Sequence, residues 1–232
     1  MLTIRNARIV TPGGIVESGA AVVDNGRFAA VGLDSGASSL GGEAIDATGL
    51  TLLPGFLDVH IHGGGGADTM DATPESLRTI LRAHARHGTT GLLLTTMTQS
   101  REAISAAIAC AAAACRPVLQ GAPFCPEGAV PLGIHLEGPY LCPTRAGAQP
   151  KEFVRDFAPD EFAEWLELAD GTMRLMTMAP ERPGADTLLR LARAAGIVVT
   201  IGHTDADADQ AGEFLAATNA AAARRRQRRR PE

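Results

Sequence analysis

Aromatic side chains are scarce in this sequence of 232 residues, at only 4%, so its core must be built mainly from Ala, Val, Leu and Ile. Apolar residues make up 45% and charged residues 20%, a balance that excludes a wholly disordered chain. No stretch approaches the roughly 20 apolar residues that cross a bilayer. The N-terminus also lacks the basic start and long apolar segment of a secretory signal. We therefore expect no membrane partner.

Paired cysteines are missing too. The four cysteines show no repeated spacing and no CxxC pair, which favours reduced thiols over a disulfide framework and predicts a cytoplasmic protein. They are Cys110, Cys115, Cys125 and Cys142.

Positive charge is in excess only at the end of the chain. The formal net charge is −5, but six of the 21 basic residues fall within Arg224–Arg230, and residues 1–223 carry 15 basic and 25 acidic side chains. The excess of acidic side chains in residues 1–223 excludes nucleic-acid binding through overall electrostatic attraction. Residues 218–232 have no apolar periodicity, so they form either a basic arm for nucleic acid or anionic lipid, or a solvated tail. We expect a disordered tail, because like charges in a row repel one another and bury nothing.

Short strands with tight turns are predicted for residues 1–51. Asp24-Asn25-Gly26 between two apolar runs is typical of a hairpin turn. The segment is too short to bury much core by itself, so we expect a small β portion. Its predicted strands are Leu2–Val10, Gly19–Val23 and Arg27–Val31, and Ser35–Gly42 is a predicted loop.

From residue 52 to about residue 217, short apolar strands alternate with amphipathic helices. Strands that are apolar on both faces indicate a buried parallel sheet, and the βα rhythm predicts either an α/β barrel or a doubly wound sheet. The predicted strands are Leu52–His60, Gly91–Thr96, Leu132–Glu137, Met173–Met178 and Ile197–Gly202. The predicted helices run from Pro74, capped by Thr73, to a stop at Gly88, and over Arg101–Cys115, Pro159–Ala169 and Ala185–Ala195.

Two histidines lie at the end of the first of these strands. His60 and His62 are two residues apart, so their side chains share a face of an extended strand. Imidazole is the commonest side-chain ligand for zinc and similar ions, although two polar residues at a strand end give the same pattern. Gly63–Gly66 lets the backbone turn tightly and leaves room for a ligand. His84 and His87, on the next helix, are interpreted as surface or interface residues.

Two later strands end in further candidate ligands. His135 and Glu137 share a face, and their alternative role is a mutual hydrogen bond that orients the next loop. His203 follows the last strand and is followed by Thr204, a candidate N-cap. A buried carboxylate must be paired or coordinated, and the carboxyl ends of barrel strands gather at one rim. Histidine and glutamate side chains at the ends of three strands together predict a zinc-type site with an open water position. Glu181 could hydrogen-bond near the same rim.

The segment Leu53–Gly63, LPGFLDVHIHG, resembles the first-strand motif of the amidohydrolase superfamily. HLEGPY at His135–Tyr140, AGAQP at Ala146–Pro150, MAPE at Met178–Glu181 and GHTDA at Gly202–Ala206 together resemble the N-acetylglucosamine-6-phosphate deacetylases. This resemblance runs from residue 1 to about residue 217.

The resemblance implies an α/β fold, an incomplete (β/α)8 TIM-type barrel of about five βα units over residues 52–217. A small N-terminal β-sandwich portion over residues 1–51 accompanies it. It further implies hydrolysis of N-acetylglucosamine 6-phosphate to glucosamine 6-phosphate and acetate, with an amino-sugar phosphate as small-molecule partner and a possible homodimer. The implied cofactor is a divalent metal cation, Zn, Fe, Co or Mn, as one or two ions.

By position in the motifs, the resemblance assigns Glu137 and His203 as metal ligands. His60 and His62 match the extra ligand pair of members that hold two metals. Ala148 and the residue after it match the loop that touches the sugar. That next residue is Gln149, where the family usually has a histidine.

Later motifs of the family have no counterpart here. A metal-binding histidine in a T-H-L-[FY]-N stretch and a proton-carrying aspartate lie further along in the family, whereas no histidine follows His203. The resemblance therefore implies a C-terminally truncated chain with no catalytic residue of its own, whose Ala/Arg-rich end is what a shifted reading frame would give. The alternatives are an inactive fragment that acts at most as a metal-binding module, or another amidohydrolase.

Overall fold

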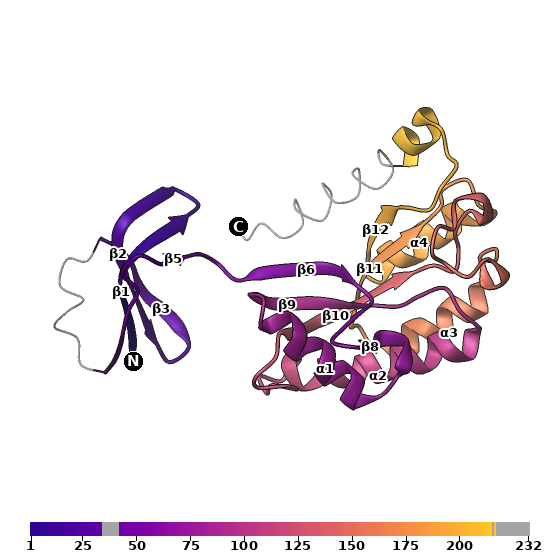
Figure 1. Ribbon diagram of the computed structural model, residues 1–232. Helices are drawn as coiled ribbons and strands as arrows, with labels where there is room; N and C mark the ends of the chain where they lie inside the picture. The colour runs from indigo at the N-terminus through magenta and orange to yellow at the C-terminus, as the bar shows by residue number, and fades with distance from the viewer. Residues whose placement is uncertain (34–41, 215, 217–232) are drawn as a thin grey trace, which may run out of the picture. The chain divides into compact units, whose positions relative to one another are not determined.

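The computed structural model describes residues 1–33, 42–214 and 216, and the chain divides into two compact units between Gly55 and Phe56 (Figure 1). The predicted disordered tail and most of the predicted Gly/Ser-rich loop lie outside the described residues.

The N-terminal unit is a single mixed sheet of five strands in the order β3-β2-β1-β4, with β5 also paired to β1. Its β2–β3 hairpin turns at Asn25 and Gly26, whose φ angles of 48° and 73° are those that a two-residue hairpin turn requires, as predicted. Ala7, Ile9 and Ala47 form its small core. The strands are β1 (Leu2–Thr11), β2 (Gly14–Asp24), β3 (Arg27–Leu33), β4 (Glu43–Asp46) and β5 (Thr51–Leu52).

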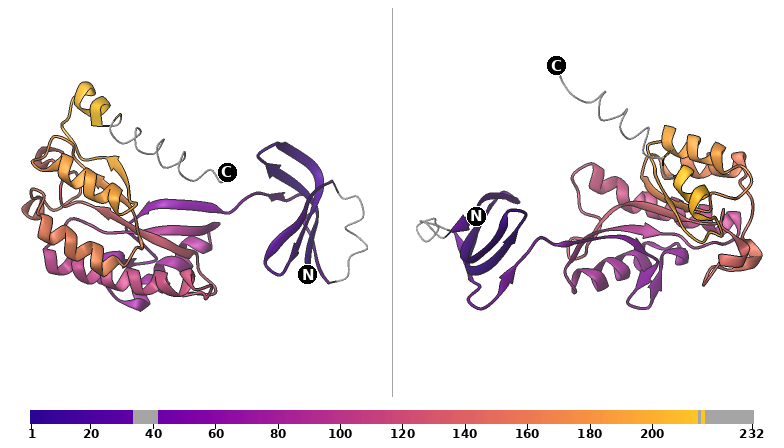
Figure 2. Two further views of the ribbon diagram at one scale, coloured as in Figure 1. Left: turned by 180° about the vertical axis from the view of Figure 1, so that it is seen from behind. Right: turned by 90° about the horizontal axis from the view of Figure 1, so that it is seen from above.

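The C-terminal unit is built on a parallel sheet in the order β12-β11-β10-β9-β6, with a helix between most successive strands (Figures 1 and 2). Strand order follows chain order without reversal, whereas a doubly wound sheet reverses its order at a switch point. The prediction of an incomplete (β/α)8 barrel is confirmed. The strands are β6 (Phe56–Ile61), β9 (Thr89–Thr95), β10 (Val130–Glu137), β11 (Met173–Met178) and β12 (Val198–Ile201). The helices are α1 (Pro74–Ala85), α2 (Arg101–Leu119), α3 (Pro159–Ala169) and α4 (Ala185–Ala194).

Helix α2 extends beyond the predicted end at Cys115 and contains Pro117 in its last turn. Within the part of the chain that the structure describes, it is the one helix long and apolar enough to cross a membrane by length and composition. Core helices meet the same criteria, and Ile104, Ala107 and Ile108 of α2 are fully buried in the core of this unit. The helix therefore gives no reason to assign a membrane span.

One face of the parallel sheet packs against the helices, and the other is partly open. Leu92 and Leu94 of β9 belong to the fully buried core. On the other face, Leu57 and Leu132 are 67% and 41% exposed. Their side chains lie over Gly91, where an added Cβ would come within 2.7 Å of Leu132 Cδ1. The open face is therefore apolar towards the amino ends of the strands, opposite the end that carries the histidines.

The loop that follows β10 is tied to α3 by a buried ionic network. Glu161, only 4% exposed, accepts a hydrogen bond of 2.8 Å from the Tyr140 hydroxyl. Arg155 donates to Glu161 Oε1 at 3.2 Å and to Glu161 Oε2 at 2.7 Å, and also to the carbonyl oxygens of Gln99 and Phe153. Burial together with the nearby Glu161 carboxylate raises the pKa of Tyr140, so its hydroxyl stays protonated and donates.

We expect Arg155→Met to destabilise the protein by about 3–5 kcal/mol, because it leaves the buried Glu161 carboxylate without its cation. Arg101→Met is the matched control: its exposed pairs with Asp160 and Glu164 are worth about 0–1 kcal/mol. Urea denaturation of both variants measures the difference. The double change Arg155→Met with Glu161→Gln should recover much of the loss, and equal unfolding midpoints for the two single variants would contradict this account.

Candidate metal centre

A buried carboxylate lies at the centre of the candidate site. Glu137 is the last residue of β10 and is 3% exposed. Its Oε2 lies 2.8 Å from His62 Nε2 and 3.3 Å from His60 Nε2, and its Oε1 lies 3.2 Å from His203 Nε2. The structure thus brings all four predicted ligands together. The ligand atoms of His60, His62 and Glu137 all lie within 4.8 Å of one another.

Strand β6 and the glycines after it place the first two histidines. The backbone N–H of Ile61 donates to Thr95 Oγ1 at 2.9 Å, which fixes the end of β6 against β9. Gly63 then pairs with Asp68 in the short hairpin of β7 (Gly63–Gly64) and β8 (Ala67–Asp68), where a Cβ added to Gly63 would lie only 2.2 Å from the Ala67 carbonyl oxygen. His84, interpreted from the sequence as a surface or interface residue, is half-buried and contacts the Gly63 carbonyl oxygen through Nε2 at 3.1 Å.

A contact of ring nitrogen Nδ1 orients the His203 side chain. Its backbone has a φ of 51°, and its Nδ1 lies 3.0 Å from the carbonyl oxygen of Arg145. A carbonyl only accepts, so Nδ1 carries a proton, and an Nε2 without a proton of its own would face the Glu137 oxygen with a lone pair. Two acceptors facing each other are stabilised only by a proton or a cation between them. Metal-bound histidines characteristically donate their other N–H in this way, so the donor set fits a divalent cation.

The electrostatics keep the central carboxylate ionised. Burial alone would raise the pKa of Glu137, but the hydrogen bond from His62 and the charges of His60, His62 and His203 lower that pKa to about 2. The same bond to Glu137 raises the pKa of His62, against the effect of burial. Glu137 is therefore ionised at neutral pH, as a carboxylate ligand of a cation must be.

His135 does not bond to Glu137, which was the alternative drawn from the sequence. Its Nδ1 lies 3.1 Å from the Val59 carbonyl oxygen and its Nε2 lies 2.8 Å from Thr177 Oγ1, which in turn contacts Thr200 Oγ1 at 2.9 Å. Burial, followed by the nearby His60, lowers the pKa of His135 to about 4, so this imidazole is neutral at pH 7. It links β6, β10 and β11 just behind the ligands.

The two predicted sugar-contacting residues differ in their surroundings. Ala148 is exposed, whereas Gln149 is 4% exposed. Gln149 accepts a hydrogen bond of 2.7 Å from the backbone N–H of Thr98 and donates one of 2.8 Å to Glu137 Oε2. Both polar atoms of the Gln149 side chain are therefore engaged inside the cluster.

Glu181 anchors the segment that carries His203. It accepts hydrogen bonds from the Thr204 hydroxyl and, at 2.8 Å, from the Asp205 backbone N–H. The sequence-based assignment of Thr204 as N-cap was wrong: the next helical residues are capped by Asp207, whose side chain accepts from the Gln210 N–H at 2.9 Å. The sequence placed Glu181 near the rim but could not identify its hydrogen-bond partners, because they lie 23 and 24 residues away along the chain.

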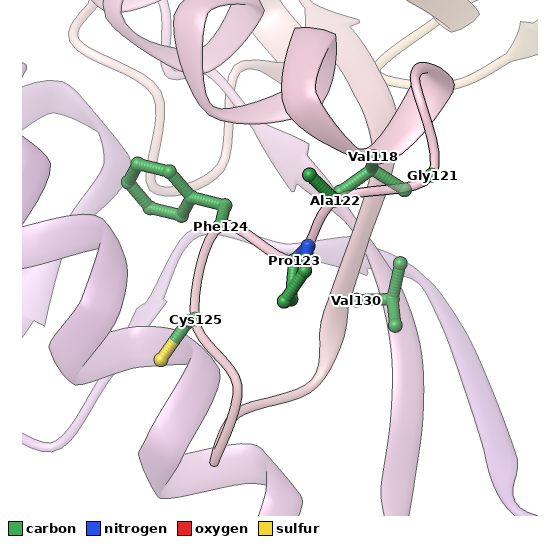
Figure 3. Close-up of a pocket in the computed structure, with 7 residues that line it drawn as sticks. All are labelled: Val118, Gly121, Ala122, Pro123, Phe124, Cys125 and Val130. Atoms are coloured by element: carbon green, nitrogen blue, oxygen red, sulfur yellow. The ribbon is translucent and has the colours of Figure 1, made fainter.

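A separate hollow of about 280 Å³ lies at the other end of β10, near its first residue, Val130 (Figure 3). Apart from the Cys125 thiol, the side chains that line it are apolar, so it lacks the convergent polar groups of a catalytic site. They belong to Val118, Ala122, Pro123, Phe124, Cys125 and Val130, with Gly121 completing the wall.

Comparison with known proteins assigns the chain to a family. The model of the amidohydrolase family matches residues 51–222, and the chain belongs to this family. It is 38% identical over 209 residues to the N-acetylglucosamine-6-phosphate deacetylase of Bacillus subtilis (strain 168), covering 89% of this chain and 51% of the relative. It is 36% identical over 155 residues to the N-acetylgalactosamine-6-phosphate deacetylase of Escherichia coli O157:H7, covering 67% of this chain and 39% of the relative.

A solved structure shows the same likeness in three dimensions. It is a variant of the N-acetyl-D-glucosamine-6-phosphate deacetylase of Mycobacterium smegmatis in complex with N-acetyl-D-glucosamine-6-phosphate. The TM-score is 0.77 at 30% identity, over 90% of this chain and 51% of that one. The chain thus spans about half the length of the relatives that it matches.

We expect Glu181→Ala to loosen the segment that carries His203, because two hydrogen bonds to a charged group are lost. Amide hydrogen exchange at Asp205 should quicken about tenfold or more, equivalent to about 1.4 kcal/mol. Burial raises the pKa of Glu181, but its hydrogen bonds, chiefly those from the Thr204 hydroxyl and the Asp205 backbone N–H, together lower that pKa by more, so the net pKa lies below 4.5. The anchoring is therefore complete above about pH 4.5 and is lost as the pH falls through the lowered folded-state pKa.

Asp186→Ala provides the control for this experiment, since Asp186 lines the same small hollow as Glu181. It should leave exchange at Asp205 unchanged at pH 7. Equal exchange rates in the Glu181→Ala protein and the unchanged protein at pH 7 would show that Glu181 does not anchor the segment.

Proposed function

We propose that this chain carries the metal-binding part of a cytoplasmic deacetylase site that acts on N-acetylglucosamine 6-phosphate. The reaction yields glucosamine 6-phosphate and acetate and belongs to amino-sugar breakdown. The observation that carries the proposal is the convergence of three imidazole nitrogens on the buried carboxylate of Glu137, within an HLEGP strand end. Four free cysteines, buried or half-buried, support a reducing compartment.

A divalent cation at this cluster would lower the pKa of a bound water and polarise the acetyl carbonyl oxygen. Glu137 supplies the negative charge among the four ligands, and the three histidines supply neutral donors. Its Oε2 faces His60 and His62 while its Oε1 faces His203, so the carboxylate presents one oxygen to each side. These residues would hold one divalent cation or two. Imidazole and carboxylate donors suit Zn, Fe, Co or Mn.

Neighbouring residues hold these donors in place. Neutral His135 fixes the ends of three strands, and the backbone carbonyl oxygen of Arg145 accepts a hydrogen bond from Nδ1 of His203. Arg145 also binds the Asp205 carboxylate through Nε at 2.9 Å and Nη2 at 2.6 Å. Ligands whose second contacts are fixed in this way lose less conformational freedom when a cation binds.

We expect the purified chain to bind divalent cation, and His62→Ala, His203→Ala or Glu137→Ala to weaken that binding about tenfold or more, since loss of outer-shell partners alone costs about 10–100-fold. His87→Ala, which changes an exposed histidine of the turn that follows α1, is the matched control and should bind as the unchanged chain does. Isothermal titration with Zn²⁺ and elemental analysis of the purified samples give the measurement. Unchanged stoichiometry in all three ligand variants would overturn the assignment.

Substrate choice is tested with two epimeric sugars, because the relatives are named for both N-acetylglucosamine 6-phosphate and N-acetylgalactosamine 6-phosphate. We expect the metal-loaded chain to release acetate faster from N-acetylglucosamine 6-phosphate, since the chain is 38% identical to the Bacillus subtilis relative and 36% and 32% identical to two N-acetylgalactosamine-6-phosphate deacetylases. Enzymatic acetate assay measures both rates. Faster release from the galactosamine epimer would reassign the substrate. Bound metal without acetate release from either sugar would support the second candidate, a metal-binding module, which the open apolar face of the sheet favours.

A further inference from the structure

The side chain of Gln149 spans two segments of the metal centre. Its Oε1 accepts from the Thr98 backbone N–H at 2.7 Å, and its Nε2 donates to Glu137 Oε2 at 2.8 Å. Thr98 follows β9 and Glu137 ends β10, so one carboxamide joins the ends of two neighbouring strands. The position of the loop is set locally, because the Gln149 N–H donates to the Ala146 carbonyl oxygen at 2.9 Å.

The partners leave a single orientation for this carboxamide. The Thr98 backbone N–H is only a donor and the ionised Glu137 is only an acceptor, so the amide oxygen must face Thr98 and the amide nitrogen must face Glu137. A flipped carboxamide would set two donors and two acceptors against each other. Since Gln149 is 4% exposed, water does not compete for either bond.

The hydrogen bond from Gln149 restrains the orientation of the Glu137 carboxylate. Oε2 receives Gln149 Nε2 at 2.8 Å and His62 Nε2 at 2.8 Å. Oε1 lies 3.2 Å from His203 Nε2. Rotation of the carboxylate about its terminal bond would exchange the two oxygens' positions, and the Gln149 bond opposes that rotation, since it is fixed at its far end by Thr98.

We infer that Gln149 is a positioning residue of the metal centre, which holds the Glu137 carboxylate so that Oε2 faces His60 and His62 while Oε1 faces His203. This inference rests on the proposed function, in that the four groups bind a divalent cation. It differs from a role in contacting the sugar, because both polar atoms of the Gln149 side chain are already paired within the protein.

The test uses Co²⁺ alone, titrated into the metal-free chain and followed by its visible absorption spectrum. Gln149→Met keeps the length of the side chain but has no amide, so we expect Co²⁺ affinity to fall about 10–100-fold and the spectrum to change. Gln149→His restores one ring N–H donor for Glu137 and one acceptor for Thr98. It should recover most of the lost affinity, which a loss of packing alone would not allow.

Ser105→Ala is the control for general loss of stability. It removes the hydroxyl that accepts from Trp165 Nε1 and donates to Glu164, away from Glu137, and should leave Co²⁺ affinity and spectrum unchanged. Binding by the Gln149→Met chain with the affinity and spectrum of the unchanged chain would overturn the inference, as would a Gln149→His chain as weak as Gln149→Met. Absence of Co²⁺ binding by the unchanged chain would overturn the proposed function itself, and the role assigned to Gln149 with it.

Discussion

An ionised carboxylate buried at the end of a strand sets the requirements that the rest of this site meets. Removing such a charge from water costs several kcal/mol even after the protein relaxes. Glu137 is compensated by three imidazoles and one carboxamide, which come from β6, from the segment after β12 and from the loop after β10. Because no single segment supplies enough partners, the strand ends and the loops must assemble together before the carboxylate is satisfied.

The surrounding contacts extend this requirement outward. The loop after β10 is tied to α3 through Tyr140 and Glu161, and the segment that carries His203 is tied to Glu181. Each of these anchors pairs a carboxylate with donors, so each depends on its own charge being kept. The segments around Glu137 are thus held by ionic contacts that do not themselves touch Glu137. The apolar core on the helix side of the sheet keeps the strands and helices that carry these contacts rigid.

Local patterns in the sequence were sufficient to predict the strands and helices of the C-terminal unit. Short runs that are apolar on both faces located all five strands of the parallel sheet, with β11 and α3 matching their predicted residues, and the spacing of His60 and His62 correctly put them on one face. Helix α2 ran past its predicted end because Pro117 is accommodated in the last turn. What the patterns could not provide was the identity of distant partners. His135 meets Val59 across 76 residues and Gln149 meets Thr98 across 51, and periodicity reports only on near neighbours.

The backbone at His203 shows what this centre demands of the chain. A φ of 51° is a conformation that an imidazole-bearing residue rarely adopts and that glycine adopts freely, at a difference of about 1–2 kcal/mol. Glycine there would relax the main chain and remove the nitrogen that faces the carboxylate. Stability would therefore favour glycine at position 203, whereas the contact with Glu137 requires histidine. The presence of histidine shows that the contact is kept at the expense of stability.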